Sequence, residues 1–137
     1  MDGARSARRG ELGLAVLFAT SGMLHLLTPR RFELIVPRPL PGKRALVYLS
    51  GAAELGCAAG LVAPATRRAA GLASAGLLVS VFPANVQMAL HTGLYPQFSA
   101  VTLWLRLPFQ LVLIAWAYWL TRRDTVHRSE IVEHRAA

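Results

Sequence analysis

Residues 45–64 read ALVYLSGAAELGCAAGLVAP, and this stretch decides the fold class. Its only charged side chain is Glu54. A helix of about 20 residues, rising 1.5 Å per residue, crosses about 30 Å of hydrocarbon, which is the length that this stretch supplies. A segment inside lipid must satisfy its own backbone hydrogen bonds, so the stretch is predicted to be a membrane-spanning α-helix.

Three further apolar blocks have a similar length, at about 12–28, 69–92 and 101–120. The 137-residue chain is 54% hydrophobic and only 16% charged, whereas soluble domains carry roughly 25% charged residues. The first block is longer than a usual signal-peptide core and lacks a clean cleavage site, so it is predicted to be a retained span. The sequence thus predicts an all-α fold: an antiparallel bundle of four transmembrane helices in a single integral-membrane domain covering residues 1–137.

The connections between these blocks differ in character. Residues 29–44, PRRFELIVPRPLPGKR, contain four prolines and five basic residues. Proline prevents a long helix there, so we expect an interfacial Pro-rich loop or a short surface helix between the first two spans. Residues 65–68 are predicted to form a tight turn, residues 93–100 an uncharged loop, and residues 122–137 a charged, flexible tail.

The net charge of +8 would indicate a nucleic-acid partner in a soluble chain. Here the basic residues lie mostly at the ends and in two connections, which is typical of a topology signal, and the predicted partner is the lipid bilayer rather than nucleic acid. Four spans place both termini on one side, with nine Lys and Arg residues against five on the other. Both termini are therefore predicted to be cytoplasmic, in a bacterial cytoplasmic membrane, although the five basic residues of the first loop oppose this orientation.

Six polar side chains stand out within the spans because polar groups in a membrane are costly and usually face the bundle interior. They are His25, Glu54, Asn85, His91, Arg106 and Gln110. With alternating helix directions, their positions fall mostly in the half of the membrane away from the termini. The other half of each span is nearly all Leu, Ala, Val and Gly. The six residues are therefore the candidate ligand-binding site, a polar pocket in the outer half of the membrane.

Glu54 raises the sharpest question, because a lone carboxylate in hydrocarbon takes up a proton. Arg106 lies at a similar depth and offers a planar fork to a carboxylate. We expect the two either to pair or to line one polar cavity, with Asn85 completing the network. His25 and His91 would then lie at its outer mouth.

Simpler readings stay open at this stage. A Glu–Arg pair can serve only to hold helices in register, and His91 can lie at the level of the head groups. No metal site is predicted from His25, His91 and Glu54, because no HxxxH or ExxH spacing supports it. The single cysteine, Cys57, is expected to be a buried hydrophobe and cannot form an internal disulfide, so any redox role must use a bound cofactor or a partner.

Four stretches carry a resemblance to a known family: SGMLHLLTPRRFELIVPRPLP (21–41), LVYLSGAAELGCAAGL (46–61), VFPANVQMALH (81–91) and WLRLPFQLVLIAWA (104–117). The sequence resembles the DoxX-like family of small four-helix membrane proteins over about residues 11–120. The resemblance implies several roles, including a subunit linked to thiosulfate–quinone oxidoreduction, components of membrane redox complexes, and an assembly chaperone for receptor channels. It implies no catalytic motif for this chain.

Three functions follow as alternatives. The first is an accessory component of a redox system whose outer pocket binds a quinone. The second is a non-enzymatic assembly chaperone or structural subunit that binds a membrane protein partner or forms a homo-oligomer through small-residue faces. The third is a small-solute carrier, which would need dimerisation because four spans without repeats are few for one chain.

Overall fold

The computed structural model describes residues 2–136, with side chains described from Arg8 to Arg122. It contains the helices α1 (Asp2–Leu27), α2 (Pro29–Glu33), α3 (Lys43–Val62), α4 (Arg67–Leu90) and α5 (Ala100–Ala136), with a 3-10 turn η1 (Thr92–Leu94) between the last two. No strand occurs between residues 2 and 136. The predicted all-α fold is confirmed.

Four of these helices are long and apolar enough to cross a membrane. The spanning segments are Arg8–Leu27, Lys43–Val62, Arg67–Leu90 and Ala100–Arg122. They contain the four predicted blocks almost entirely, but α1 begins well before residue 12, because hydropathy marks where apolar residues begin and not where the helix begins. Residues 122–137 are predicted to be a flexible tail. The side chains after Arg122 are outside the described part of the structure, so this stays a prediction.

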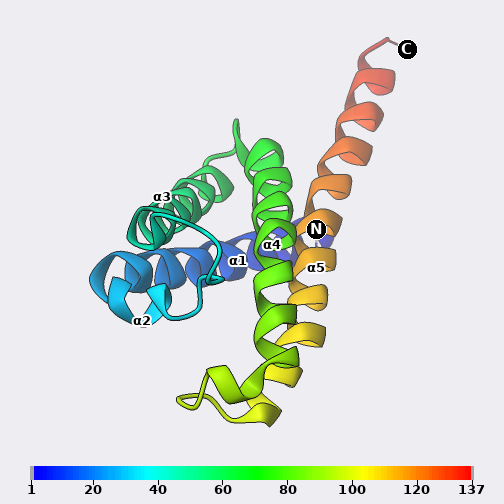
Figure 1. The fold of residues 1–137 in the computed structure, drawn as a ribbon. Helices are drawn as coiled ribbons and strands as arrows, with labels where there is room; N and C mark the ends of the chain where they lie inside the picture. Colours follow the sequence, from blue (N-terminus) through cyan, green and yellow to red (C-terminus); the bar gives the residue numbers. More distant parts are fainter. Residues whose placement is uncertain (1, 137) are drawn as a thin grey trace.

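The helices are arranged as two antiparallel pairs (Figure 1). Helix α1 packs along α3, and α4 packs along α5. In Figure 1 the α1–α3 pair runs across the picture and the α4–α5 pair runs down it. Packing between α3 and α4 joins the pairs, and Gly10 and Gly13 of α1 meet Trp116 and Leu120 near the middle of α5. The bundle is therefore a pair of hairpins that meet at one end.

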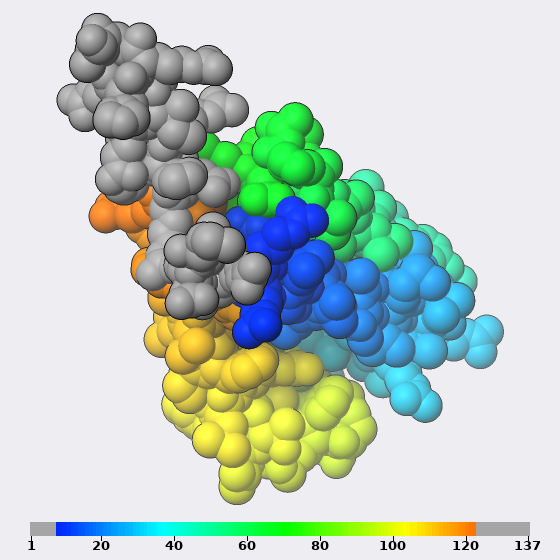
Figure 2. All heavy atoms as spheres, turned by 180° about the vertical axis from the view of Figure 1, so that it is seen from behind, coloured from blue at the N-terminus to red at the C-terminus, as the bar shows by residue number. Residues whose placement is uncertain are grey.

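We call the end where the hairpins meet the closed half; it carries the short 63–66 turn. Apolar side chains from all four long helices are buried together there: Leu14, Ala15, Phe18, Cys57, Ala58, Leu61, Ala70, Ala117 and Leu120. In Figure 2, seen from behind, the blue stretch of α1 lies beside the orange part of α5. These side chains contact one another and not the surroundings of the protein. Their van der Waals contacts hold the two hairpins together.

The opposite end, which carries the connections 28–42 and 91–99, is called the open half. Its smaller buried cluster consists of Met88, Ala89, Tyr95 and Leu103. All four residues belong to the α4–η1–α5 hairpin, and Ile35 of the 28–42 connection packs against them, so the cluster stabilises this hairpin and anchors the connection to it. The two hairpins part in this half.

Two glycines allow α1 and α3 to touch. A Cβ atom added to Gly22 would lie 2.7 Å from the backbone oxygen of Gly51, and one added to Gly51 would lie 2.9 Å from Cβ of His25. Both distances are shorter than side chains tolerate, so only glycine permits this contact. The contact places the His25 turn of α1 directly against the Glu54 turn of α3.

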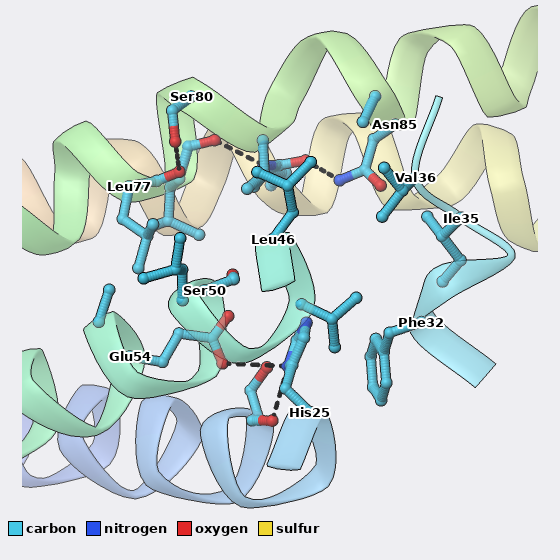
Figure 3. Close-up of a pocket in the computed structure, with 18 of the residues that line it drawn as sticks. His25, Phe32, Ile35, Val36, Leu46, Ser50, Glu54, Leu77, Ser80 and Asn85 are labelled. Carbon is cyan, nitrogen blue, oxygen red and sulfur yellow. Dashed lines mark hydrogen bonds and ion pairs between the residues drawn. The ribbon is translucent and has the colours of Figure 1, made fainter. Parts of the chain in front are cut away.

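The 28–42 connection folds back over the space between the hairpins (Figure 1). It begins with the five-residue helix α2, whose Pro29 supplies a preset helical φ. Nε of Arg44 donates to Oε1 of Glu33 at 2.7 Å, and Gly42 takes a left-handed conformation (φ 64°) just before α3 begins. The predicted Pro-rich connection with a short helix is confirmed, and Phe32 and Ile35 point from it toward the cavity described below (Figure 3).

Candidate functional site

A cavity of about 650 Å³ lies between the two hairpins in the open half. Its walls come from α1, the 28–42 connection, α3, α4 and α5, and most of its lining is aliphatic or aromatic. Figure 3 shows His25 and Glu54 on one side of the cavity and Ser80 and Asn85 on the other. The polar residues that line it are Ser21, His25, Ser50, Glu54, Ser80, Asn85, Arg106 and Gln110.

The first polar wall is formed by His25 and Glu54. Nδ1 of His25 lies 3.4 Å from Oε2 of Glu54 and 2.8 Å from the backbone oxygen of Ser21. Because a carbonyl oxygen can only accept, Nδ1 carries a hydrogen in this arrangement. The imidazole also stacks on Phe32, with ring centroids 3.9 Å apart. These contacts hold the ring in place and leave Nε2 without a hydrogen bond to any described residue.

The second polar wall links α4 to α5. Nδ2 of Asn85 donates to Oε1 of Gln110, and Nε2 of Gln110 donates to the backbone oxygen of Leu78 at 2.7 Å. Pro83 has no N–H, so the backbone oxygen of Val79, the residue after Leu78, has no donor four residues further on in this helix. Gln110 is buried, and its amide therefore bridges the helices where lipid offers no alternative partner.

Arg106 lies one turn before Gln110 on the same face of α5 and also lines the cavity. Its guanidinium carbon lies 5.8 Å from the centroid of the Phe98 ring. Among the described residues, no carboxylate comes within ion-pair distance of this side chain. Arg106 is thus a half-buried cation whose N–H groups are available to a bound molecule.

The predicted ion pair between Glu54 and Arg106 is not formed, whereas the alternative, that both residues line one cavity, is observed. The cavity is also less polar than predicted, since most of its lining is apolar. The sequence predicts the ion pair because Glu54 and Arg106 lie at a similar depth in the membrane. Depth does not determine which helix faces are turned toward each other. The glycine contact between α1 and α3 supplies Glu54 with a neighbour from α1, His25, in place of one from α5.

His91 does not reach the site. It is exposed, follows the last residue of α4 and keeps its Nδ1 within 3.0 Å of the backbone oxygen of Gln87. The chain turns at this residue, and His91 is not among the residues that line the cavity. The predicted place of His91 at the mouth is wrong in this respect, while His25, Glu54, Asn85, Arg106 and Gln110 are brought together as lining residues.

The prediction from sequence missed a charged pair in the closed half. Nε of Arg67 lies 3.0 Å from Oε2 of Glu11, and the two side chains are only 18% and 5% exposed. Glu11 precedes the apolar block and was therefore left outside the first span. A helical face shared by Glu11, Leu14, Ala15 and Phe18 was the signal that could have placed it inside.

The donor set of the cavity indicates hydrogen-bonding and proton-exchange chemistry. Among residues 8–122, no group of three or more His, Cys, Asp and Glu side chains gathers to hold a metal ion. Cys57 is buried in the cluster of the closed half and does not line the cavity. The groups facing the cavity are instead amide, hydroxyl, imidazole, carboxylate and guanidinium.

Comparison with known families gives one match, over residues 14–121, to a family described as a domain of unknown function, DUF8561. The chain belongs to the DUF8561 family. The matched range includes every residue that lines the cavity and nearly all of the last three spans, but it begins inside the first span and excludes Glu11. No curated protein and no solved structure matches this DUF8561 chain significantly. The DoxX-like resemblance stays a prediction.

Proposed function

We propose that this integral membrane protein binds a lipophilic molecule with a hydrogen-bonding head group in the cavity between its hairpins, and that the molecule is a quinone. In this proposal the protein is an accessory component of a quinone-linked redox system in a bacterial cytoplasmic membrane, with both termini cytoplasmic. The observation that carries it is a mostly apolar cavity of about 650 Å³ that combines polar groups on facing walls with a cation that has no acidic partner among the described residues.

The size and lining of the cavity support this class of ligand. Small-molecule sites usually enclose about 300–1,000 Å³ and combine apolar walls with a few placed polar groups. The open half parts between two hairpins whose outer faces are apolar, so a ligand with a long hydrocarbon tail can extend from the cavity along Leu49 or Phe109, which line it and are exposed.

The position of the hydrogen-bonding groups supports a head group with acceptors at opposite ends. Arg106 offers N–H donors from the α4–α5 side, and His25 offers Nε2 from the α1–α3 side. A quinone ring carries carbonyl oxygens at opposite ends, so donors on facing walls match it. Nε2 is a donor in the imidazolium form of His25, and Oε2 of Glu54 lies 3.4 Å from Nδ1 of the same ring.

The chain's own residues bind and orient in this proposal, and they do not supply electrons. The single cysteine is buried away from the cavity, so electrons would come from a partner redox protein. The His25–Glu54 pair can exchange a proton with a ligand at the cavity wall. The protein is accessory in this proposal because it positions the quinone and a partner protein supplies the electrons.

The experiment is a binding titration of purified full-length protein with a short-tailed quinone analogue, followed by tryptophan fluorescence and by mass spectrometry of co-isolated quinone. Arg106→Gln and Glu54→Gln are expected to weaken binding about tenfold each, because each removes a hydrogen bond to or from a charged group. The matched controls Arg38→Gln and Glu33→Gln change residues that line no part of the cavity and should leave affinity unchanged. A wild-type protein that neither retains nor binds quinone contradicts the proposal.

A second candidate function, an assembly chaperone or structural subunit, is favoured by the exposed faces of the spans. Only 17% to 28% of the most apolar window of each span is buried within the protein. Gly56 and Gly76 have no atom within 4 Å of an added Cβ, so they are not needed for packing inside the chain and leave room for a partner helix. Capture of one membrane protein by crosslinking, lost on Gly56→Leu but not on Glu54→Gln, supports this function over quinone binding.

A further inference from the structure

A second pocket, of about 480 Å³, lies where α1 ends and α3 begins. It shares no lining residue with the cavity between the hairpins. Three of its eight lining residues are arginines: Arg30, Arg31 and Arg44. We name it the arginine pocket.

The arginine pocket is strongly positive because its lining contains no acidic residue. Glu33 lies beside it and accepts one hydrogen bond from Nε of Arg44 at 2.7 Å. That contact orients Arg44 and leaves the terminal amines of its guanidinium for another acceptor. The side chains of Arg30 and Arg31 form no hydrogen bond or ion pair with any described residue. The pocket therefore holds more positive charge than Glu33 can neutralise.

The depth of the arginine pocket is that of lipid head groups. Spanning helix α1 ends at Leu27 and spanning helix α3 begins at Lys43, so both reach the membrane surface here. Leu27 is 69% exposed and Tyr48 is 41% exposed, and tyrosine is enriched at this level of a membrane. The pocket thus joins an apolar floor, which continues toward the hydrocarbon, to a cluster of guanidinium groups.

We propose that the arginine pocket binds the phosphate group of an anionic phospholipid. Guanidinium groups bind phosphate oxygens through paired N–H donors, and basic pockets beside spanning helices are suited to anionic head groups. The acyl chains lie along Leu27 and the ring of Tyr48, both of which are exposed at the rim. This proposal stands apart from quinone binding, since the two pockets share no residue.

The proposal also accounts for basic residues that oppose the predicted topology. The first connection carries five Lys and Arg residues on the side opposite both termini. Arg30, Arg31 and Arg44 serve as lipid ligands in this arrangement, so their charge reports a binding site and not the side of the membrane on which the loop resides.

The test is native mass spectrometry of delipidated full-length protein titrated with phosphatidylglycerol, with phosphatidylcholine of the same acyl chains, or with inorganic phosphate. The wild type should bind phosphatidylglycerol about tenfold more tightly than phosphatidylcholine. The double variant R30Q/R31Q should lose this preference. The control R38Q/R68Q removes the same charge from two exposed arginines outside the pocket and should keep it.

Three outcomes overturn the proposal. They are equal affinity of the wild type for the two lipids, an equal loss of preference in both double variants, and displacement of phosphatidylglycerol by inorganic phosphate at the same concentration. The last outcome would assign a free anion in place of a lipid. R30Q/R31Q should melt at the wild-type temperature in detergent, because neither side chain has a hydrogen-bond or ion-pair partner in the described part of the chain.

Discussion

The closed half and the open half of the bundle each hold a mostly enclosed glutamate, Glu11 in one and Glu54 in the other, and each has a different basic neighbour. In the closed half, Glu11 lies 3.0 Å from the guanidinium nitrogen of Arg67. In the open half, Glu54 lies 3.4 Å from His25, while Arg106 lies against the Phe98 ring with no acidic partner among the described residues. In the packed closed half a carboxylate is paired with a guanidinium. In the open half, around the cavity, the guanidinium of Arg106 keeps N–H donors that no described carboxylate accepts.

Chain length between the helices accounts for much of this difference. The 63–66 turn holds the end of α3 against the start of α4, so the hairpins stay together at the closed end. Arg67 begins α4 at this point and also lies 3.4 Å from the backbone oxygen of Leu61. At the other end the 28–42 connection joins α1 to α3 within one hairpin, so no short turn links the two hairpins there, and this connection covers the space between them. A ligand site and a packing site therefore occupy opposite ends of the same four helices.

The largest expected effect separates Glu11 from Glu54. Glu11→Gln should destabilise the protein by about 3 kcal/mol, because it removes one partner of a buried ion pair. Glu54→Gln makes the same chemical change, but His25 keeps its hydrogen bond to Ser21, so we expect a smaller loss. Equilibrium unfolding of both variants in mixed detergent micelles measures the difference. Equal losses would show that the two halves do not differ as described.

The next effect concerns the glycines that set helix spacing. Gly22→Ala should destabilise the protein by about 2 kcal/mol, since the added Cβ would lie 2.7 Å from the backbone oxygen of Gly51. Gly56→Ala is the matched control in α3, where an added Cβ meets nothing within 4 Å and helix propensity improves. Thermal unfolding in detergent should therefore rank Gly56→Ala at or above wild type. The reverse ranking would show that the close contact between α1 and α3 does not require glycine at position 22.

Thiol accessibility should sharpen the contrast between the halves. Cys57 is 7% exposed within the closed half, whereas Ser50 lines the cavity of the open half. In a Cys57→Ala background, Ser50→Cys should react with a small maleimide about tenfold faster than Cys57 does in the wild type, because reaction requires access and an ionised thiol. Rapid labelling of Cys57 would mean that the closed half opens readily.

A smaller effect is expected at the polar wall between α4 and α5. Asn85→Leu removes the hydrogen bond to Gln110 and should cost about 1 kcal/mol, as is usual for polar contacts between membrane helices. Ser80→Ala is the control, because the Ser80 hydroxyl donates only to Leu77 in its own helix. Unfolding measurements on the pair decide whether the Asn85–Gln110 contact joins the helices. A loss in Ser80→Ala as large as that in Asn85→Leu would contradict this role.

The sequence by itself determined the four spanning helices and most of the residues in the candidate site. Hydrophobic length predicts a spanning helix because lipid offers no partner to an unpaired backbone group, and this holds whatever the tertiary structure. The cost of polar side chains in lipid likewise directs them inward, so His25, Glu54, Asn85, Arg106 and Gln110 could be assigned to one region.

Only the tertiary structure decided which of these side chains meet. The rotation of each helix about its axis follows from packing, and here it is set by contacts such as that between Gly22 and Gly51, which gives Glu54 a histidine neighbour in place of Arg106. His91 lies outside the cavity lining because the chain turns where α4 ends. Glu11 is buried because α1 begins before its apolar block, so the helix carries this residue into the closed half. The position of a residue within an apolar block indicates its depth in the membrane. Its contact partner depends on which faces of the neighbouring helices are turned toward it.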